Sequence, residues 1–261
     1  MAASLFLDLD GRPISDSAVV GYGRSGVVVR QGPLAIKTPL RHPWSSEADV
    51  RSNIDVIERE QEVYRRLGSG ENQIHGVVPC VELCTNATHL ALMENGDLRT
   101  YLETNKPTRG AQLAWFRQMA RALEQIHGKS VLVADIAARN FLLDSNLNIR
   151  ICDFSEASIL PIETEMESAD DNGFSVQTDI GLLGAVMYEV ITGRKCEYDL
   201  YQADTGDGRA ACPPRSSLPD TRGLWLGPIL ESCWTGGFRN AQRLAEALDS
   251  FDLEHTPDKA P

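Results

Sequence analysis

Three side chains with metal-binding oxygen atoms are spaced in this sequence as phosphoryl transfer requires. Asp135 and Asn140 lie five residues apart, and Asp153 follows Asn140 after thirteen residues. Carboxylate and carboxamide oxygens are the ligands that magnesium prefers in proteins, and a carboxylate can also orient an attacking hydroxyl group. The set therefore predicts that Asn140 and Asp153 hold magnesium while Asp135 orients an acceptor hydroxyl.

A glycine-rich segment lies upstream of these residues and is followed by an apolar strand that ends in lysine. The run Gly21-Tyr22-Gly23-Arg24-Ser25-Gly26-Val27-Val28 fits the pattern G-x-G-x-x-G-x-V at every fixed position. Glycines there let backbone amides approach phosphate oxygens, which a Cβ would block, although such spacing also occurs in ordinary tight turns. The strand Leu34-Ala35-Ile36-Lys37 ends eleven residues after Gly26. This spacing favours a phosphate-binding lysine over a solvated strand end.

The segments between these motifs predict the elements that position them. Short runs of β-branched residues between Gly-containing turns indicate strands near the N-terminus. Apolar residues at helical spacing indicate helices further on, and Asp97 and Gly128 are placed to cap two of them. The expected elements are strands at 19–29, 34–38, 77–83 and 89–93, and helices at 54–67, 97–102, 113–127, 175–191 and 240–251.

Together, these motifs resemble those of the eukaryotic protein kinase superfamily. The catalytic loop of these kinases, and most of all its tyrosine-kinase version, is similar to the run Val133-Ala134-Asp135-Ile136-Ala137-Ala138-Arg139-Asn140. Their Asp-Phe-Gly motif is similar to Asp153-Phe154-Ser155. The resemblance extends from about residue 18 to 251. It implies a single domain with an α+β, bilobal protein kinase-like fold. The small β-rich N-lobe would span about 15–94, the larger helical C-lobe about 95–251 and a loose tail 252–261.

The resemblance also implies that the protein uses ATP and Mg²⁺, and it assigns a role to particular residues. Asp135 would accept the proton of the acceptor hydroxyl, and Arg139 would offset charge on the transferred group. Lys37, positioned by Glu60, would fix the α- and β-phosphates, and Asp179 would tie down the catalytic loop backbone. The nucleotide-binding positions would be Gly21, Tyr22, Gly23, Arg24, Ser25, Gly26, Val28, Ala35, Lys37 and Leu142.

Three glutamates are candidates for the acidic partner of Lys37, namely Glu58, Glu60 and Glu62 on the helix expected at 54–67. Glu60 is favoured because apolar residues follow it at three, four and seven positions, which places it on the buried stripe of the helix. Glu58 and Glu62 remain alternatives.

The catalytic segments depart from the kinase pattern at several positions. Val133 and Ala134 replace the usual His-Arg, and the missing arginine is the one that usually binds an activation-segment phosphate. Ser155 replaces the glycine of Asp-Phe-Gly, which makes a positive φ angle costlier there. Ala137 stands where Ser/Thr kinases place a lysine, and Arg139 can supply the same charge.

The segment that normally cradles a peptide substrate is short. Only 26 residues separate Asp153 from Asp179, and no Ala-Pro-Glu motif lies between them. Glu165 or Glu163 is expected to take the place of that motif's glutamate and to pair with Arg239.

These features predict a protein kinase that transfers the γ-phosphoryl group of ATP to a protein hydroxyl, on Ser/Thr or Tyr. One alternative is a pseudokinase that acts as a nucleotide-binding interaction module, which the altered motifs and the short segment favour. Another is a small-molecule phosphotransferase of the same fold. The Ala-Ala-Arg-Asn run and the Cys233-Trp234 pair count against this third class.

Composition and charge exclude other classes of protein. The 261 residues are 42% apolar and 24% charged, as in ordinary globular domains. The net charge of −12 argues against binding to nucleic acid or to an anionic membrane. No apolar run is long enough to span a bilayer, and the N-terminus has no basic region of a signal peptide. A cytoplasmic monomer with a protein substrate or partner is expected.

The six cysteines show no C-x-x-C spacing. Cys80 and Cys84 lie four residues apart, but no nearby pair of His or Cys residues completes a zinc site. Thiols in a reducing compartment are therefore expected.

Overall fold

The strand-forming segments near the N-terminus build one antiparallel sheet. The computed structural model describes residues 4–68, 73–202 and 208–253. Its five-stranded sheet has the order β1-β2-β3-β5-β4. The strand predicted at 34–38 is confirmed, the run 19–29 forms two strands joined by the glycine-rich turn, and the segments predicted at 77–83 and 89–93 form strands at shifted bounds. These strands are β1 (Val19–Tyr22), β2 (Gly26–Gln31), β3 (Leu34–Pro39), β4 (Cys80–Cys84) and β5 (Ala87–Ala91), preceded by the 3-10 turn η1 (Asp16–Ala18).

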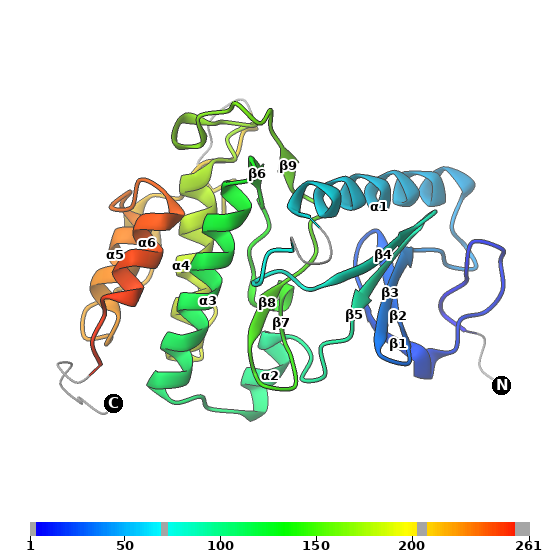
Figure 1. Ribbon diagram of the computed structural model, residues 1–261, viewed down its shortest axis with the longest axis horizontal. Helices are drawn as coiled ribbons and strands as arrows, with labels where there is room; N and C mark the ends of the chain where they lie inside the picture. The colour runs from blue at the N-terminus through cyan, green and yellow to red at the C-terminus, as the bar shows by residue number, and fades with distance from the viewer. Residues whose placement is uncertain (1–3, 69–72, 203–207, 254–261) are drawn as a thin grey trace. The chain divides into compact units, whose positions relative to one another are not determined.

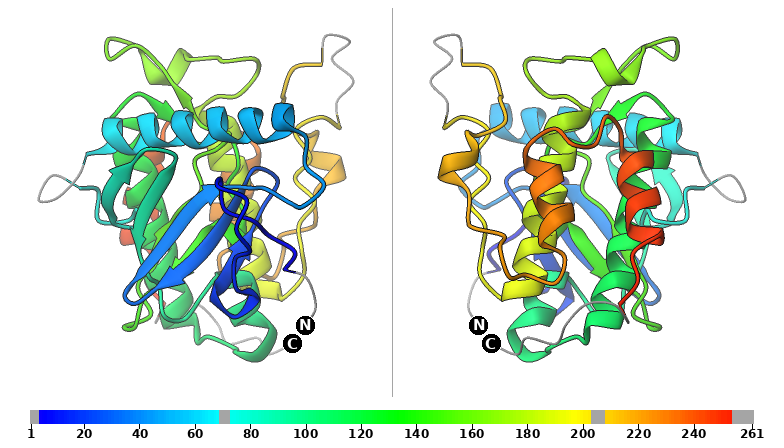
Figure 2. Two further views of the ribbon diagram at one scale, coloured as in Figure 1. Left: turned by 90° about the vertical axis from the view of Figure 1, so that its right-hand side faces the viewer. Right: turned by 90° about the vertical axis from the view of Figure 1, so that its left-hand side faces the viewer.

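The helix between β3 and β4 is longer than the sequence pattern predicts. Helix α1 (Glu47–Leu67) begins seven residues before Ile54 because Ser46 and Asp49 form a reciprocal capping box at its N-terminus. The helix lies against β3 and β5 (Figure 2). It thereby brings its buried stripe, which includes Glu60 and Tyr64, to the sheet.

The chain divides into two compact units, which we call unit 1 and unit 2. Unit 1 takes in the chain up to Gln73 together with Val78–Glu94 and Asp153–Ser155. Unit 2 takes in Ile74–Val77, Asn95–Cys152 and the chain from Glu156 onward. The three residues Asp153–Ser155 thus belong to the same unit as the sheet, although they are far from it in sequence.

Unit 2 is built mainly of helices. Helix α3 contacts α4 and α6, and α4 contacts α5 (Figure 1). Asp97 accepts a hydrogen bond from the Thr100 amide, which confirms it as the N-cap of α2. The helices are α2 (Leu98–Thr104), α3 (Arg109–His127), α4 (Val176–Thr192), α5 (Gly227–Trp234) and α6 (Ala241–Asp249), with 3-10 turns η3 (Ala138–Asn140), η4 (Met166–Ser168) and η5 (Arg215–Ser217).

Helix α4 forms the buried centre of unit 2, as its apolar sequence predicts. Glycines on it allow other elements to come close. A Cβ at Gly181 would lie 1.9 Å from the Tyr198 hydroxyl, and one at Gly184 would lie 2.9 Å from Trp234 Nε1. Trp234 Nε1 donates to the Gly181 carbonyl over 3.2 Å. The Cys233-Trp234 pair is therefore part of the packing that fixes α4.

Two short ribbons complete unit 2. β6 (Val131–Leu132) pairs with β9 (Ser158–Ile159), and β7 (Phe141–Leu143) pairs with β8 (Ile149–Ile151). The tail that we predicted to be loose, 252–261, lies outside the described residues beyond position 253. Among the residues that the structure describes, no helix combines the length and apolarity needed to cross a membrane.

Candidate functional site

Lys37 is the centre of a charged cluster inside unit 1. Its Nζ lies 3.0 Å from Glu60 Oε1, 2.9 Å from Glu60 Oε2 and 2.8 Å from Asp153 Oδ1. Lys37 is 8% exposed and Glu60 is fully buried, whereas Glu58 and Glu62 are exposed. The structure thus selects Glu60 among the three candidate partners.

Two opposing effects set the charge state of this cluster. Burial alone lowers the pKa of Lys37, but the neighbouring charges of Glu60 and Asp153 raise that pKa above its ordinary value of 10.5. Burial likewise works to raise the pKa of Asp153, and the Lys37 charge outweighs it and lowers that pKa below 3.8. Lys37 is therefore a cation and Asp153 an anion at neutral pH.

Helix α1 also holds the backbone that follows Asp153. The Phe154 amide donates to Glu60 Oε1 over 2.9 Å, and the Phe154 ring meets the Tyr64 ring edge-on at 5.4 Å. Asp153 has a φ angle of 63°, which a non-glycine residue keeps only when its surroundings enforce it. A positive φ angle is costlier at Ser155 than at a glycine, and the positive φ angle of this motif lies at Asp153 and not at Ser155.

The glycine-rich turn between β1 and β2 has open space above two of its glycines. A Cβ at Gly21 or Gly23 would meet no other atom within 4 Å, whereas one at Gly26 would lie 3.1 Å from Lys37 Cε. The Gly23 amide donates to the Gly26 carbonyl over 2.8 Å and closes the turn. Tyr22 is 66% exposed and its ring packs 5.1 Å from that of Phe6, a contact that the sequence did not predict.

The strands place the other predicted nucleotide-binding residues of unit 1 beside Lys37. Val28 is the register partner of Lys37 on β2, and Ala35 precedes Lys37 by two residues on β3. Since side chains two apart on a strand share a face, these three residues lie on one face of the sheet. Val27 points to the opposite face, where it packs with Phe6. Arg24 and Ser25 lie in the turn itself, and Ser25 anchors it by accepting from the Leu40 amide at 2.8 Å.

The predicted catalytic residues of unit 2 cluster around Asp135. Arg139 Nη2 lies 2.6 Å from both carboxylate oxygens of Asp135. Asn140 Nδ2 donates to the Asp135 carbonyl at 2.9 Å and to Oδ2 at 3.0 Å. These bonds fix the carboxamide that would offer its oxygen to magnesium. Leu142, at the centre of β7, is half-buried between two buried neighbours.

The backbone that leads into this cluster is held by a buried carboxylate. Asp179, which is fully buried, accepts from the Val133 amide at 2.8 Å and from the Ala134 amide at 2.9 Å. The prediction that Asp179 ties down the loop is therefore confirmed. Ala134 has a φ angle of 65°, and the two bonds enforce it. His127 Nε2 lies 2.8 Å from Asp179 Oδ2. We did not predict this role for His127, because a histidine that ends a helix has no distinguishing pattern in sequence.

The segment after Ser155 is folded against unit 2 by its own contacts. The Leu160 amide donates to the Ser130 carbonyl at 2.8 Å, which extends the β6–β9 ribbon. Gly173 has a φ angle of 90°, and a Cβ there would lie 1.8 Å from the Ala210 carbonyl oxygen. No other residue type fits this turn.

The glutamate that pairs with Arg239 is not the one we predicted. We expected Glu165 or Glu163, but Glu167 Oε2 lies 3.3 Å from Arg239 Nη2 and Glu167 Oε1 accepts from Asn240 at 2.7 Å. The 3-10 turn η4 includes Glu167 and turns it toward this partner. The Arg239 side chain is 82% exposed, so the pair contributes little to stability.

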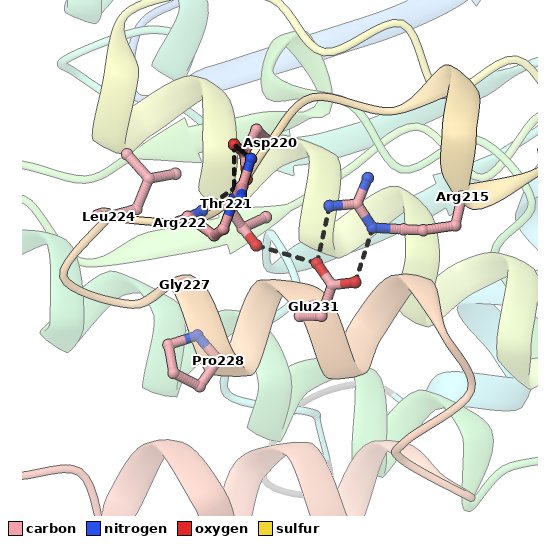
Figure 3. Close-up of a pocket in the computed structure, with 9 residues that line it drawn as sticks. Arg215, Asp220, Thr221, Arg222, Leu224, Gly227, Pro228 and Glu231 are labelled. Carbon is pink, nitrogen blue, oxygen red and sulfur yellow. Dashed lines mark hydrogen bonds and ion pairs between the residues drawn. The ribbon is translucent and has the colours of Figure 1, made fainter.

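Unit 2 also contains an open pocket of about 620 Å³, shown in Figure 3. Its size is within the range of small-molecule sites, but its charges neutralise one another. Glu231 accepts from Arg215 at 2.8 and 2.7 Å and from Thr221 at 2.9 Å, and Arg222 pairs with Asp220 at 2.7 Å. These groups hold the segment before α5 in place, and we assign no catalytic role to the pocket.

Comparison with protein families gives a match over most of the chain. Residues 46–247 match the model of the family "protein tyrosine and serine/threonine kinase". This region contains Glu60, Asp135, Asn140, Asp153 and Asp179. It begins after the glycine-rich turn and Lys37, so these two features are supported by the sequence pattern and by the geometry of unit 1.

Curated proteins similar to this chain include kinases of both specificities. The chain is 25% identical over 192 residues to the tyrosine-protein kinase receptor TYRO3 of Danio rerio, with 63% of this chain and 21% of the receptor covered. It is 29% identical over 198 residues to a probable serine/threonine-protein kinase of Dictyostelium discoideum, with 69% and 39% covered. It is 29% identical over 181 residues to the tyrosine-protein kinase JAK3 of Rattus norvegicus, with 55% and 16% covered. The chain therefore spans well under half the length of these relatives.

Proposed function

Because this chain belongs to the protein tyrosine and serine/threonine kinase family, we propose that it transfers the γ-phosphoryl group of ATP to a hydroxyl group of a protein. The observation that carries the proposal is the buried Lys37, whose ammonium group is held between Glu60 and Asp153. Burying a cation together with two carboxylates costs desolvation free energy. Such clusters are typical of functional sites.

The residues of unit 1 fit a magnesium nucleotide. The open space above Gly21 and Gly23 leaves their backbone amides approachable by phosphate oxygens. Lys37 would bind the α- and β-phosphates as a preorganised cation. The Asp153 side chain is 36% exposed, so it can offer an oxygen to Mg²⁺ while it stays bonded to Lys37. Bound magnesium would neutralise charge on the phosphates and on the transferred group.

The residues of unit 2 fit the acceptor side of the reaction. Asn140 orients the Asp135 carboxylate, which would accept a hydrogen bond and then the proton from the attacking hydroxyl. Arg139 would move from Asp135 to the transferred phosphoryl group and offset its charge. Asn140 would share the binding of magnesium through its carboxamide oxygen. Positioning and charge stabilisation supply most of the rate enhancement in reactions of this class.

One observation favours the alternative of a pseudokinase that binds nucleotide as an interaction module. Both oxygens of Asp135 lie 2.6 Å from the Arg139 guanidinium, so the carboxylate is engaged by Arg139 and not by an acceptor hydroxyl as long as the pair persists. Ala134 in place of the usual arginine and the short segment before α4 agree with this alternative.

Two measurements separate these functions. Purified protein with labelled ATP and Mg²⁺ is expected to label itself or members of a mixed peptide library, and labelling is expected to disappear in Asp135→Asn. A protein that shows a magnesium-dependent thermal shift with ATP but no transfer to any peptide would be the pseudokinase. Transfer to small alcohols alone would indicate the small-molecule phosphotransferase.

A matched pair of glycine substitutions tests the nucleotide site itself. Gly23→Ala is expected to leave the melting temperature of the free protein unchanged, because its Cβ meets no atom within 4 Å. It is expected to weaken the rise in melting temperature that Mg-ATP causes by preferential binding. Gly110→Ala in α3, where the nearest atom would be 3.9 Å away, is the control; it should raise the melting temperature of the free protein slightly, because alanine favours a helix more than glycine, and it should leave the ATP-dependent rise unchanged. An equal thermal shift in all three proteins would refute binding at the glycine-rich turn.

The proposal includes a cytoplasmic location and a protein substrate bound by a monomer. None of the six cysteines, all within the described residues, forms a disulfide, which agrees with a reducing compartment. The net charge of −12 supports a partner other than nucleic acid or an anionic membrane.

A further inference from the structure

The hairpin of β4 and β5 in unit 1 brings together three side chains that commonly bind transition metals. One ligand atom from each of Glu82, Cys84 and His89 lies within 4.8 Å of the other two. His89 Nδ1 is 3.4 Å from Glu82 Oε2, and the Cys84 thiol is hydrogen-bonded to Glu82. The set was not expected from sequence, where we considered only Cys80 and Cys84 as a pair.

A β-bulge explains why these side chains share one face of the hairpin. The register shifts between Cys80 and Glu82, so that Glu82 lies directly opposite His89. Cys84 follows Glu82 by two residues and therefore points to the same side. The intervening position Leu83 pairs with Thr88, which is fully buried on the other face. Without the extra residue, Glu82 would not face His89.

The separations suit a tetrahedral metal after a small adjustment. Bonds of about 2.0–2.3 Å from zinc to nitrogen, oxygen and sulfur place neighbouring ligand atoms roughly 3.3–3.7 Å apart. The Glu82–His89 distance of 3.4 Å already has this value. All three separations are within 4.8 Å and therefore need to shrink by at most about 1.5 Å, and the Glu82 side chain, which is 64% exposed, is free to move.

The backbone of the hairpin turn is fixed by helix α1. Gln61 Nε2 donates to the Cys84 carbonyl and to the Ala87 carbonyl, each at 2.9 Å. Gln61 is 3% exposed and adjoins Glu60, the partner of Lys37. Rigid support of this kind orients ligand side chains and strengthens metal binding. A metal that joined Cys84 to His89 would in turn stabilise the hairpin turn. It would thereby also stabilise the hydrogen bonds between this turn and Gln61 of α1.

We propose that Glu82, Cys84 and His89 form a binding site for a divalent transition metal of the zinc class, with water as the fourth ligand. An ordinary cross-strand pair of His89 and Glu82 accounts for the contact between these two side chains but not for the position of Cys84 beside both. A thiolate, an imidazole and a carboxylate together select zinc over magnesium or calcium, which prefer oxygen ligands alone. The site is therefore chemically distinct from the magnesium ligands Asn140 and Asp153.

Titration of the metal-free protein with Co²⁺ tests the proposal. We expect one equivalent to produce a thiolate-to-cobalt absorption band in the near ultraviolet and the visible bands of a tetrahedral ion. Zn²⁺ should displace the Co²⁺ and raise the melting temperature. Cobalt held by the oxygen ligands of the magnesium site would show no thiolate band, so the two sites are distinguishable.

Variants decide which residues bind the metal. Cys84→Ser should abolish the thiolate band, and His89→Gln should weaken binding at least about tenfold, the loss that even an outer-shell change can cause. Cys212→Ser and His75→Gln, which alter an exposed cysteine and an exposed histidine elsewhere, should bind as the wild type does. The proposal is overturned if no thiolate band appears at stoichiometric Co²⁺, or if the band survives in Cys84→Ser.

Discussion

Removing one partner of the buried Lys37–Glu60 pair is expected to destabilise unit 1 more than removing one partner of a surface pair. Among the residues that the structure describes, Lys37→Met leaves the fully buried Glu60 carboxylate with only the Phe154 amide as a donor. Removing one partner of a buried pair costs about 3–5 kcal/mol, a large share of a total stability of about 5–15 kcal/mol. The Asp153 side chain is 36% exposed and can regain water, so it adds little to this loss.

Removing both charges is expected to be less harmful than removing one. In Lys37→Met/Glu60→Gln, the glutamine carbonyl can still accept the Phe154 amide, and no charge is left buried without a partner. We expect this double variant to lose about 1–2 kcal/mol. The two substitutions are therefore expected to be non-additive, with a coupling energy of about 2 kcal/mol or more.

The pH dependence of this contribution follows from the two shifted pKa values. The pKa of Lys37 is raised, so its contribution is complete below the unfolded value of 10.5 and is lost only as the pH rises through the higher folded value. The pKa of Asp153 is lowered, so its contribution is complete above 3.8 and is lost as the pH falls through the lower folded value. The Lys37 contribution is therefore expected to be constant up to about pH 9, and the Asp153 contribution down to about pH 5.

Urea denaturation followed by circular dichroism, combined with hydrogen exchange of peptides from α1, measures these energies. Hydrogen exchange is needed because two units do not necessarily unfold together. A loss below about 1 kcal/mol in Lys37→Met, or strict additivity in the double variant, would refute the reasoning. Because Lys37→Met is expected to destabilise the free protein, nucleotide binding by this variant must be measured as the change in melting temperature that ATP causes, and not from the melting temperature alone.

Four further predictions concern the rest of the site and the core of unit 2. Asp135→Asn is expected to leave ATP affinity within a few-fold while turnover collapses, which isothermal titration and initial rates would show. In Asp179→Asn, the carboxylate that accepts from two backbone amides becomes a carboxamide, whose NH2 group must face one of those amides. The substitution should lower the free energy of unfolding, measured by urea denaturation, by about 2–4 kcal/mol. Thr164→Ala/Ser168→Ala and phosphatase treatment are expected to preserve the rate of any transfer; a tenfold loss, about 1.4 kcal/mol, would contradict this. Gly76→Ala would place a Cβ 2.2 Å from a methyl group on α3 and should lower stability by about 1–3 kcal/mol.

The expected independence from phosphorylation rests on two structural observations. Ala134 offers no charge to a phosphate, and its backbone is already held by Asp179. The segment that follows Ser155 is also held within unit 2 through β9 and the turn at Gly173. Added phosphate therefore has no disordered loop to organise. Glu163, Glu165 and Glu167 already place negative charge along this segment.

The motif residues and most helices could be predicted from sequence because they depend on local pattern. The Asp97 cap and the buried stripe of α1 are examples, since spacing alone identifies them. The early start of α1 was missed because only Val50 continues the apolar stripe before Ile54. The capping box at Ser46 has Asp in the position usually taken by Glu or Gln, which weakened its signal.

Features that depend on contacts distant in sequence could not be predicted. Nothing in the local sequence distinguishes Glu167 from Glu165, because the choice depends on where η4 meets Asn240. The left-handed φ angles of Ala134 and Asp153 were also hidden, since alanine rarely adopts this region and aspartate does so only occasionally. The meeting of Cys84 with His89 requires the register of two strands, which a bulge shifts by one residue.

The division of unit 1 along the chain has a consequence for how the protein is made. Lys37 and Asp153 are 116 residues apart, and Glu60 and Phe154 are 94 apart. At about 5–20 residues per second, a ribosome that has completed residue 94 needs on the order of 3–12 s more to reach residue 155. During this interval, the face of α1 that carries Tyr64 lacks its aromatic partner and Glu60 lacks the Phe154 amide. Nascent chains at this stage therefore expose a surface that favours aggregation and chaperone binding, and fragments that end before Asp153 will retain this unfinished surface.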